Sequence, residues 1–128
     1  MKEKLIKLLE NSHSPYSRFR VAAIVVMKDG REFSGVNVEN ASYGATICAE
    51  RSAIVSAVSN GYKKGDFDCL YVMCDTDKIS TCCFICRQVI TEFFKPSQKI
   101  TLMNPAGASV EYTVAEMCPY PFDEDDLA

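Results

Sequence analysis

The chain has 128 residues, of which 48% are hydrophobic and 24% are charged, and its formal net charge is -3 at pH 7. This composition is typical of a globular domain and excludes a disordered chain, and the negative charge argues against a broad nucleic-acid surface. No segment approaches the ~20 apolar residues of a membrane-spanning helix, so we expect neither a nucleic acid nor a membrane as a partner.

The N-terminal segment predicts an amphipathic helix from about Glu3 to Ser12, which Pro15 ends. The segment lacks the uninterrupted apolar run and the small-residue cleavage site of a signal peptide. We therefore expect a cytoplasmic protein. In that reducing compartment, disulfides between the seven cysteines are not expected.

Residues 20–40 contain two apolar runs joined by Asp29-Gly30, which is a strong hairpin signal. The rest of the chain predicts, in order, an alanine-rich helix over 47–60, a buried strand over 69–74, a helix that starts within 83–94, strands over 99–104 and 109–114, and a short helical turn in the C-terminal tail. A hairpin followed by strand–helix–strand crossovers favours a mixed sheet with helices on both faces. We predict an α/β fold, a three-layer α/β/α sandwich, forming a single domain over residues 1–128.

The first chemical signal is a pair of cysteines near the start of a predicted helix. Cys83 and Cys86 are three residues apart, so both sulfurs can face the same point. A helix N-terminus favours anions and thereby lowers the pKa of a thiol. Taken alone, the pair fits a zinc site, a thioredoxin-type redox couple, or chance.

Cys48 lies at the start of another predicted helix. Two helices that follow parallel strands can direct their N-termini to one spot, and three thiolates would then leave the fourth position of a catalytic zinc open to water. Glu50 follows two residues later and can take a proton from metal-bound water. The alternative role for Glu50 is a first-turn carboxylate that complements the helix dipole.

The segments "CAE" at 48–50 and "CCFIC" at 82–86 fit the signature of zinc deaminases. The sequence resembles the small homotetrameric cytidine deaminases whose zinc ligands are all cysteines. The resemblance is carried, in chain order, by "SPYSRFRVAA", "GVNVENASYG", "CAERSAI", "CRQVITEFF" and "PYPF". These motifs extend over most of the chain.

The resemblance implies one Zn²⁺ per chain, held by Cys48, Cys83 and Cys86. It implies that Glu50 is the general acid and base, and that Arg51 hydrogen-bonds the thiolates and offsets their negative charge. It also implies a set of substrate-binding residues: Phe19 on the pyrimidine face, Asn37 and Glu39 at the ribose hydroxyls, Ala49 at the amide edge of the base, Ala41 and Tyr43 at a neighbouring subunit's substrate, and Phe122 closing a pocket across an interface.

The implied activity is zinc-dependent hydrolytic deamination of cytidine and deoxycytidine to uridine and deoxyuridine, a reaction of pyrimidine salvage. Such an enzyme is a hydrolase acting on the C–N bond of a cyclic amidine. Its reactants are a pyrimidine nucleoside and water, and zinc-bound hydroxide attacks C4 while Glu50 shuttles protons. The resemblance further implies a homotetramer with shared active sites.

The sequence departs from the family pattern on both sides of Cys83, because Cys82 and Phe84 replace the usual proline and glycine. Cys82 is interpreted as inert packing, with an alternative zinc ligand and an oxidisable thiol as the other options. The competing functions are deamination of another aminopyrimidine nucleoside such as blasticidin S, a zinc-stabilised binding module without turnover, and a thiol redox protein using Cys83 and Cys86.

Overall fold

The computed structural model describes residues 1–127 and is built around a five-stranded sheet with the spatial order β2-β1-β3-β4-β5. The strands are β1 (Val21–Met27), β2 (Glu32–Val36), β3 (Phe67–Cys74), β4 (Lys99–Met103) and β5 (Ser109–Thr113). The α-helices are α1 (Lys2–Leu9), α2 (Ala49–Ser59), α3 (Phe84–Phe93) and α4 (Val114–Met117), and 3₁₀ turns lie at Tyr43–Ala45 and Glu124–Leu127. The predicted order of the main elements is confirmed.

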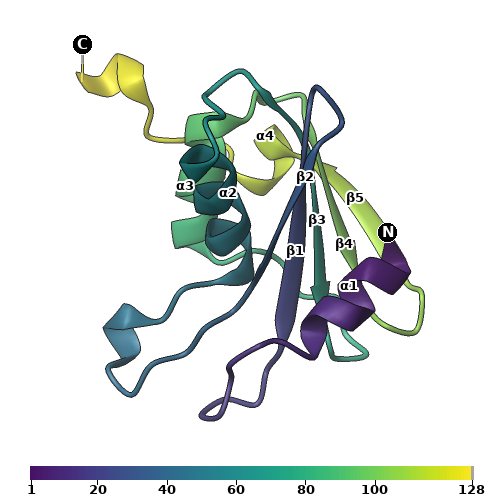
Figure 1. Cartoon of the computed structure of the whole chain (residues 1–128). Helices are drawn as coiled ribbons and strands as arrows, with labels where there is room; N and C mark the ends of the chain where they lie inside the picture. The colour runs from purple at the N-terminus through teal and green to yellow at the C-terminus, as the bar shows by residue number, and fades with distance from the viewer. Residues whose placement is uncertain (128) are drawn as a thin grey trace.

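Helices cover both faces of the sheet (Figure 1). On one face, Leu5 and Leu9 of α1 form an apolar cluster with Ala22 and Ile24 of β1. On the other face, the alternate residues of β1 join a larger core beneath α2 and α3. Successive side chains of a strand point to opposite faces, so a strand covered on both sides is apolar throughout. The three-layer α/β/α sandwich with a mixed sheet is thereby confirmed.

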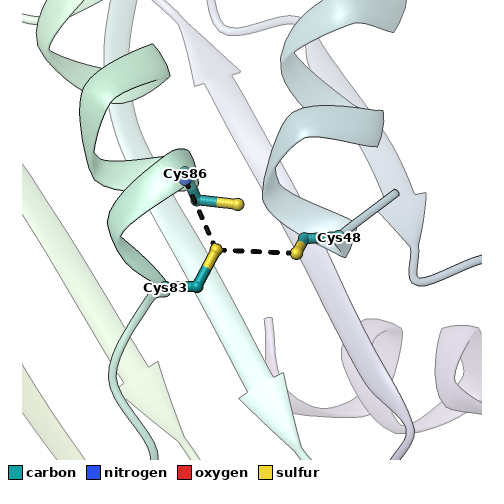
Figure 2. A group of neighbouring side chains, drawn as sticks. All are labelled: Cys48, Cys83 and Cys86. Atoms are coloured by element: carbon teal, nitrogen blue, oxygen red, sulfur yellow. Dashed lines mark hydrogen bonds between the residues drawn. The ribbon is translucent and has the colours of Figure 1, made fainter. Parts of the chain in front are cut away.

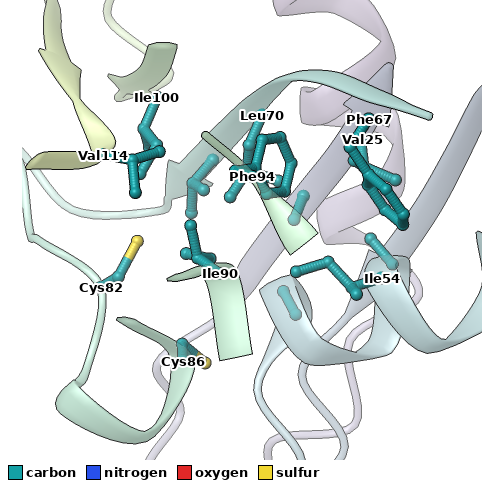
Figure 3. Packing of buried hydrophobic residues seen from close by; sticks show 14 of the residues in the cluster. Val25, Ile54, Phe67, Leu70, Cys82, Cys86, Ile90, Phe94, Ile100 and Val114 are labelled. Atoms are coloured by element: carbon teal, nitrogen blue, oxygen red, sulfur yellow. The ribbon is translucent and has the colours of Figure 1, made fainter. Parts of the chain in front are cut away.

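The larger core is filled by aliphatic and aromatic side chains (Figure 3). The ring of Phe67, at the start of β3, lies 5.2 Å from the ring of Phe93 and 5.3 Å from that of Phe94. Cys82 and Cys86 belong to the same core cluster, and their sulfurs point in different directions. Within residues 1–127, none of the helices has the length and apolar character needed to cross a membrane.

The directions of the strands bring the starts of α2 and α3 together. Both β2 and β3 pair antiparallel with β1, so they run in the same direction on either side of it. Helix α2 follows β2, and α3 follows β3 and leads to the parallel strand β4. The two helices therefore begin at the same end of the sheet (Figure 1).

Gly35 in β2 allows α2 to lie directly on the sheet. A Cβ atom at this position would lie 2.4 Å from the backbone nitrogen of Ala53 and 2.6 Å from the carbonyl oxygen of Ala49. Ala49, Ala53 and Ala57 line the contact face of the helix and are fully buried. The absence of a side chain at Gly35 thus determines how closely the first turn of α2 approaches the sheet.

Candidate metal centre and active site

Three cysteine thiols meet where α2 and α3 begin (Figure 2). Cys48 is the N-cap residue of α2, Cys83 is the N-cap residue of α3, and Cys86 lies in the first turn of α3. The sulfurs of Cys48 and Cys83 are 3.7 Å apart, and the three sulfurs all lie within 4.8 Å of one another. The backbone N–H of Cys86 donates to the sulfur of Cys83 at 3.4 Å. The convergence expected from the sequence is present.

The spacing of the thiols fits a zinc ion. Tetrahedral zinc with Zn–S bonds of about 2.3 Å places two sulfur ligands about 3.8 Å apart, which agrees with the 3.7 Å between Cys48 and Cys83. Thiolate ligands select zinc over the hard cations magnesium and calcium. Three protein ligands correspond to a catalytic site, because a structural zinc site is closed by a fourth. The residues present therefore fit one zinc ion per chain.

Arg51 interacts with the thiol cluster from the first turn of α2. Its Nη2 atom donates a hydrogen bond to the sulfur of Cys48 at 3.3 Å. Hydrogen bonds from Cys86 and from Arg51 lower the pKa of the Cys48 thiol, and the pairing with Cys48 raises the pKa of Cys86. A Zn²⁺ ion with three thiolates has a formal charge of about −1, and the Arg51 guanidinium can offset that charge.

Cys82 lies outside this group. The three-thiol cluster contains Cys48, Cys83 and Cys86, whereas the Cys82 side chain is only 3% exposed and is part of the hydrophobic core. Burial raises the pKa of the Cys82 thiol, and the nearby Glu50 carboxylate raises it further. A protonated thiol in an apolar core packs as a small hydrophobic side chain, which favours the interpretation of Cys82 as inert packing.

Glu50 combines burial with access to a cavity. It lies in the first turn of α2, its side chain is 5% exposed, and it lines the same cavity as Cys48 and Cys83. Burial raises the pKa of the Glu50 carboxyl, and the negative charge of Cys48 contributes to the rise. A bound zinc ion would oppose the effect of Cys48 but not the effect of burial. A carboxyl group with a raised pKa is suited to exchanging protons near neutral pH.

The cavity has a volume of about 240 Å³ and is lined by residues of both helix starts, β1, β3 and the preceding loops. It brings together seven of the residues expected from the sequence: Phe19, Asn37, Glu39, Cys48, Ala49, Glu50 and Cys83. Thr46, Ser80 and Thr81 also line it. These three lie in polar loops with no distinctive motif, so sequence reasoning did not identify them.

Asn37 and Glu39 hold the loop that carries Phe19. The Nδ2 atom of Asn37 donates to the carbonyl oxygen of Phe19 at 2.7 Å. One carboxylate oxygen of Glu39 accepts from the backbone N–H groups of Tyr16 at 2.9 Å and Ser17 at 3.1 Å, and the other accepts from the Ser17 hydroxyl. The two residues expected at the ribose thus also fix the position of the aromatic ring, a role that sequence reasoning missed.

Three of the expected substrate-binding residues do not line this cavity. Ala41 and Tyr43 are exposed, and Tyr43 borders a neighbouring hollow that contains Tyr16 and Glu39. Phe122 is 57% exposed in the C-terminal segment, which Figure 1 places at the opposite end of α2 and α3 from the helix starts. A contact between Phe122 and substrate would therefore require another copy of the chain.

Comparisons with known proteins agree with this arrangement. The family model of the cytidine and deoxycytidylate deaminase zinc-binding region matches residues 1–103. A cytidine deaminase of Halalkalibacterium halodurans is 41% identical over 125 residues, covering 98% of this chain and 93% of the relative. One of Sporosarcina psychrophila is 42% identical over 130 residues, covering 98% and 94%.

Among solved structures, the cytidine deaminase of Burkholderia pseudomallei superposes with a TM-score of 0.89 at 39% sequence identity, covering 94% of each chain. The match to the family model includes Cys48, Cys83 and Cys86, whose thiols converge in the structure. Fold, thiol cluster and sequence therefore agree, and the chain belongs to the cytidine and deoxycytidylate deaminase family.

Proposed function

We propose that the chain catalyses the zinc-dependent hydrolytic deamination of cytidine and deoxycytidine. Water replaces the amino group at C4 of the base, so the products are uridine or deoxyuridine and ammonia. The observation that carries the proposal is the position of the buried Glu50 beside a three-thiol zinc site, both facing one cavity. The similarity to relatives named cytidine deaminases supports it.

Cys48, Cys83 and Cys86 would hold the metal. When bound, zinc acts as a Lewis acid that makes water a better nucleophile near neutral pH. Arg51 supports this chemistry, because its hydrogen bond to the Cys48 sulfur withdraws negative charge from the ligand set.

Glu50 moves the protons of the reaction. Its carboxylate accepts a proton from the attacking water and delivers it to N3 of the base. It then accepts the remaining proton from the new C4 hydroxyl group and passes it to the amino group, which departs as ammonia. These transfers return the carboxylate to its starting state. Burial, which raises the pKa of Glu50, helps it to retain a proton between the two transfers.

The other cavity residues bind and orient the nucleoside. Phe19 packs against the pyrimidine, and the backbone of Ala49 contacts the amide edge of the base. Asn37 and Glu39 hydrogen-bond the ribose, in addition to the bonds that they make to the loop of Phe19. Each carboxylate oxygen can accept two hydrogen bonds, so Glu39 can serve both partners. Its negative charge also disfavours a phosphate at the 3′ position, which favours a free nucleoside.

The enzyme would act in the cytoplasm as a homotetramer of single-domain chains with shared active sites. The reducing cytoplasm keeps the cysteines available as metal ligands. Exposed apolar side chains on the outer surfaces of α2 and α3 support an interface, among them Val55, Val58 and Ile85. In the tetramer, Ala41, Tyr43 and Phe122 would reach the substrate of a neighbouring subunit, and light scattering of the purified protein tests the subunit number.

The activity is tested by following ultraviolet absorbance and ammonia release for zinc-loaded protein with cytidine, deoxycytidine and blasticidin S in separate reactions. The proposal predicts turnover of the first two nucleosides. Turnover of blasticidin S alone would identify a different aminopyrimidine substrate. Full zinc loading with no turnover of any of the three would indicate a binding module instead.

A further inference from the structure

Arg87, on α3, forms an extensive set of contacts next to the zinc ligands. Its Nε atom donates to the carbonyl oxygen of Cys82 at 2.7 Å, and its Nη2 atom donates to the hydroxyl of Thr81 at 3.0 Å. Its Nη1 atom donates to the carbonyl oxygen of Met117 at 2.8 Å. Three nitrogens of one guanidinium therefore bind two residues of the segment before Cys83 and the last residue of α4.

The same guanidinium lies over the ring of Phe84, with 4.4 Å between its central carbon and the ring centroid. Phe84 is the first residue of α3 and is 77% exposed. The positive guanidinium is attracted to the negative face of the aromatic ring. Phe84 occupies the position where glycine is usual in the family, so its ring adds a contact that glycine cannot make.

The segment before Cys83 lacks the proline that is usual in the family, so its position depends on packing and hydrogen bonds. Cys83 is an exposed N-cap residue, and the residue before it is Cys82, whose backbone φ angle is freer than that of a proline. Arg87 instead ties this segment to α4. A capping box formed by Thr113 and Glu116 stabilises the start of that helix.

We propose that Arg87 is a positioning residue of the metal centre, which holds the Cys83 sulfur at the distance from Cys48 that zinc binding requires. The inference rests on the zinc site of the proposed function. Geometry is essential to it, because a guanidinium directs its N–H groups in a fixed plane, whereas a lysine ammonium donates from one point. Charge alone would therefore not replace Arg87.

The inference is tested with two variants, Arg87→Met and Arg87→Lys. For each zinc-loaded protein, the rate of zinc transfer to a colorimetric chelator is measured, and the zinc affinity is measured by competition. Loss of a residue that orients metal ligands typically weakens metal binding by about 10–100-fold, which is the effect expected for Arg87→Met. Arg87→Lys should also release zinc faster than the wild type. The matched control is Arg31→Met, because Arg31 also lies over an aromatic ring, 4.9 Å from the centroid of Phe33, but in the β1–β2 hairpin.

Zinc release at the wild-type rate from folded Arg87→Met would overturn the inference. A complete return to the wild-type rate in Arg87→Lys would overturn it too, because it would assign the effect to charge alone. If Arg87→Met does not fold, faster zinc release from Arg87→Lys supports the inference and an unchanged rate overturns it. Zinc release can be measured without any deamination. A wild-type protein that binds zinc without deaminating cytidine would therefore contradict the proposed function, while the zinc-release rates of the variants would still decide this inference.

Discussion

At the scale of single residues, the site depends on a balance of charge around the metal ligands. Three thiolates would bring more negative charge than a zinc ion can neutralise, and the hydrogen bond from Arg51 to the Cys48 sulfur would offset part of it. Glu50 lies beside them but is not among the clustered ligand atoms, and its burial favours the protonated form. In the proposed mechanism, separate residues therefore bind the metal, adjust its charge and transfer protons.

The first prediction concerns Glu50→Gln. Glutamine keeps the size of the side chain but cannot exchange protons, so we expect kcat to fall by at least about 10²–10⁴-fold, the usual contribution of a general acid and base. Zinc content should stay at about one ion per chain, because Glu50 is not part of the three-thiol cluster. Zinc quantification and absorbance assays check both results, with the exposed Glu3 changed to glutamine as the control. Zinc loss as large as that of Cys83→Ala would contradict the assigned role.

At the scale of elements, the site depends on how closely α2 approaches the sheet. The contact of Gly35 with the backbone of Ala49 and Ala53 fixes the first turn of this helix. Cys48, Glu50 and Arg51 all lie at or near that turn. A displacement of α2 would therefore move the proposed metal ligand Cys48 and the proposed proton-transfer group Glu50 together.

Gly35→Ala should accordingly destabilise the fold and impair the site. The added methyl group would meet backbone atoms, which cannot rotate away, and overpacking of this kind costs about 1–3 kcal/mol. Denaturant titration should show a lower midpoint with an unchanged slope. Gly44→Ala is the matched control, because a Cβ there has no heavy atom within 4 Å. Equal midpoints for the two variants would contradict the role of the close contact.

The Glu39 loop predicts a specific acid sensitivity. The hydroxyl and N–H of Ser17 and the N–H of Tyr16 lower the pKa of Glu39 below its ordinary value of 4.5. Between the native pKa and the ordinary value of 4.5, the unfolded chain therefore binds more protons than the folded chain. The contribution of Glu39 to stability is thus present above about pH 4.5 and is lost as the pH falls through the native pKa. The free energy of unfolding should decline less below about pH 4.5 in Glu39→Gln than in the wild type. Glu10→Gln, an exposed change outside the loop, should follow the wild type, and parallel curves for Glu39→Gln and the wild type would refute the prediction.

At the scale of the whole molecule, local patterns predicted the main elements well. Asp29-Gly30 indicated the hairpin, and Gly30 has the positive φ angle, 89°, that this turn favours. Alternation and apolar runs predicted the strands, because a strand that is buried on both faces consists almost entirely of apolar residues. The expected positions of Cys48, Cys83 and Cys86 at helix starts, together with the resemblance to the family, indicated that the three thiols converge, as they do in the structure.

The contacts that support the site could not be predicted in the same way. Arg87 binds the carbonyl oxygen of Met117, 30 residues away, and Asn37 binds that of Phe19, 18 residues away. A backbone carbonyl is present in every residue, so such bonds leave no sequence pattern. Gly35 offered a weak signal, because a glycine inside a strand pattern often marks the close approach of another backbone.

The most direct test is a zinc titration of the metal-free protein, with cytidine deamination as the readout. Activity should rise linearly and saturate at about one zinc per chain. Cys82→Ala should show the same end point, because Cys82 packs in the core, whereas Cys83→Ala should neither retain zinc nor recover activity. Activity that is independent of zinc, or loss of zinc from Cys82→Ala but not from Cys83→Ala, would contradict the assignment of Cys48, Cys83 and Cys86 as the metal centre.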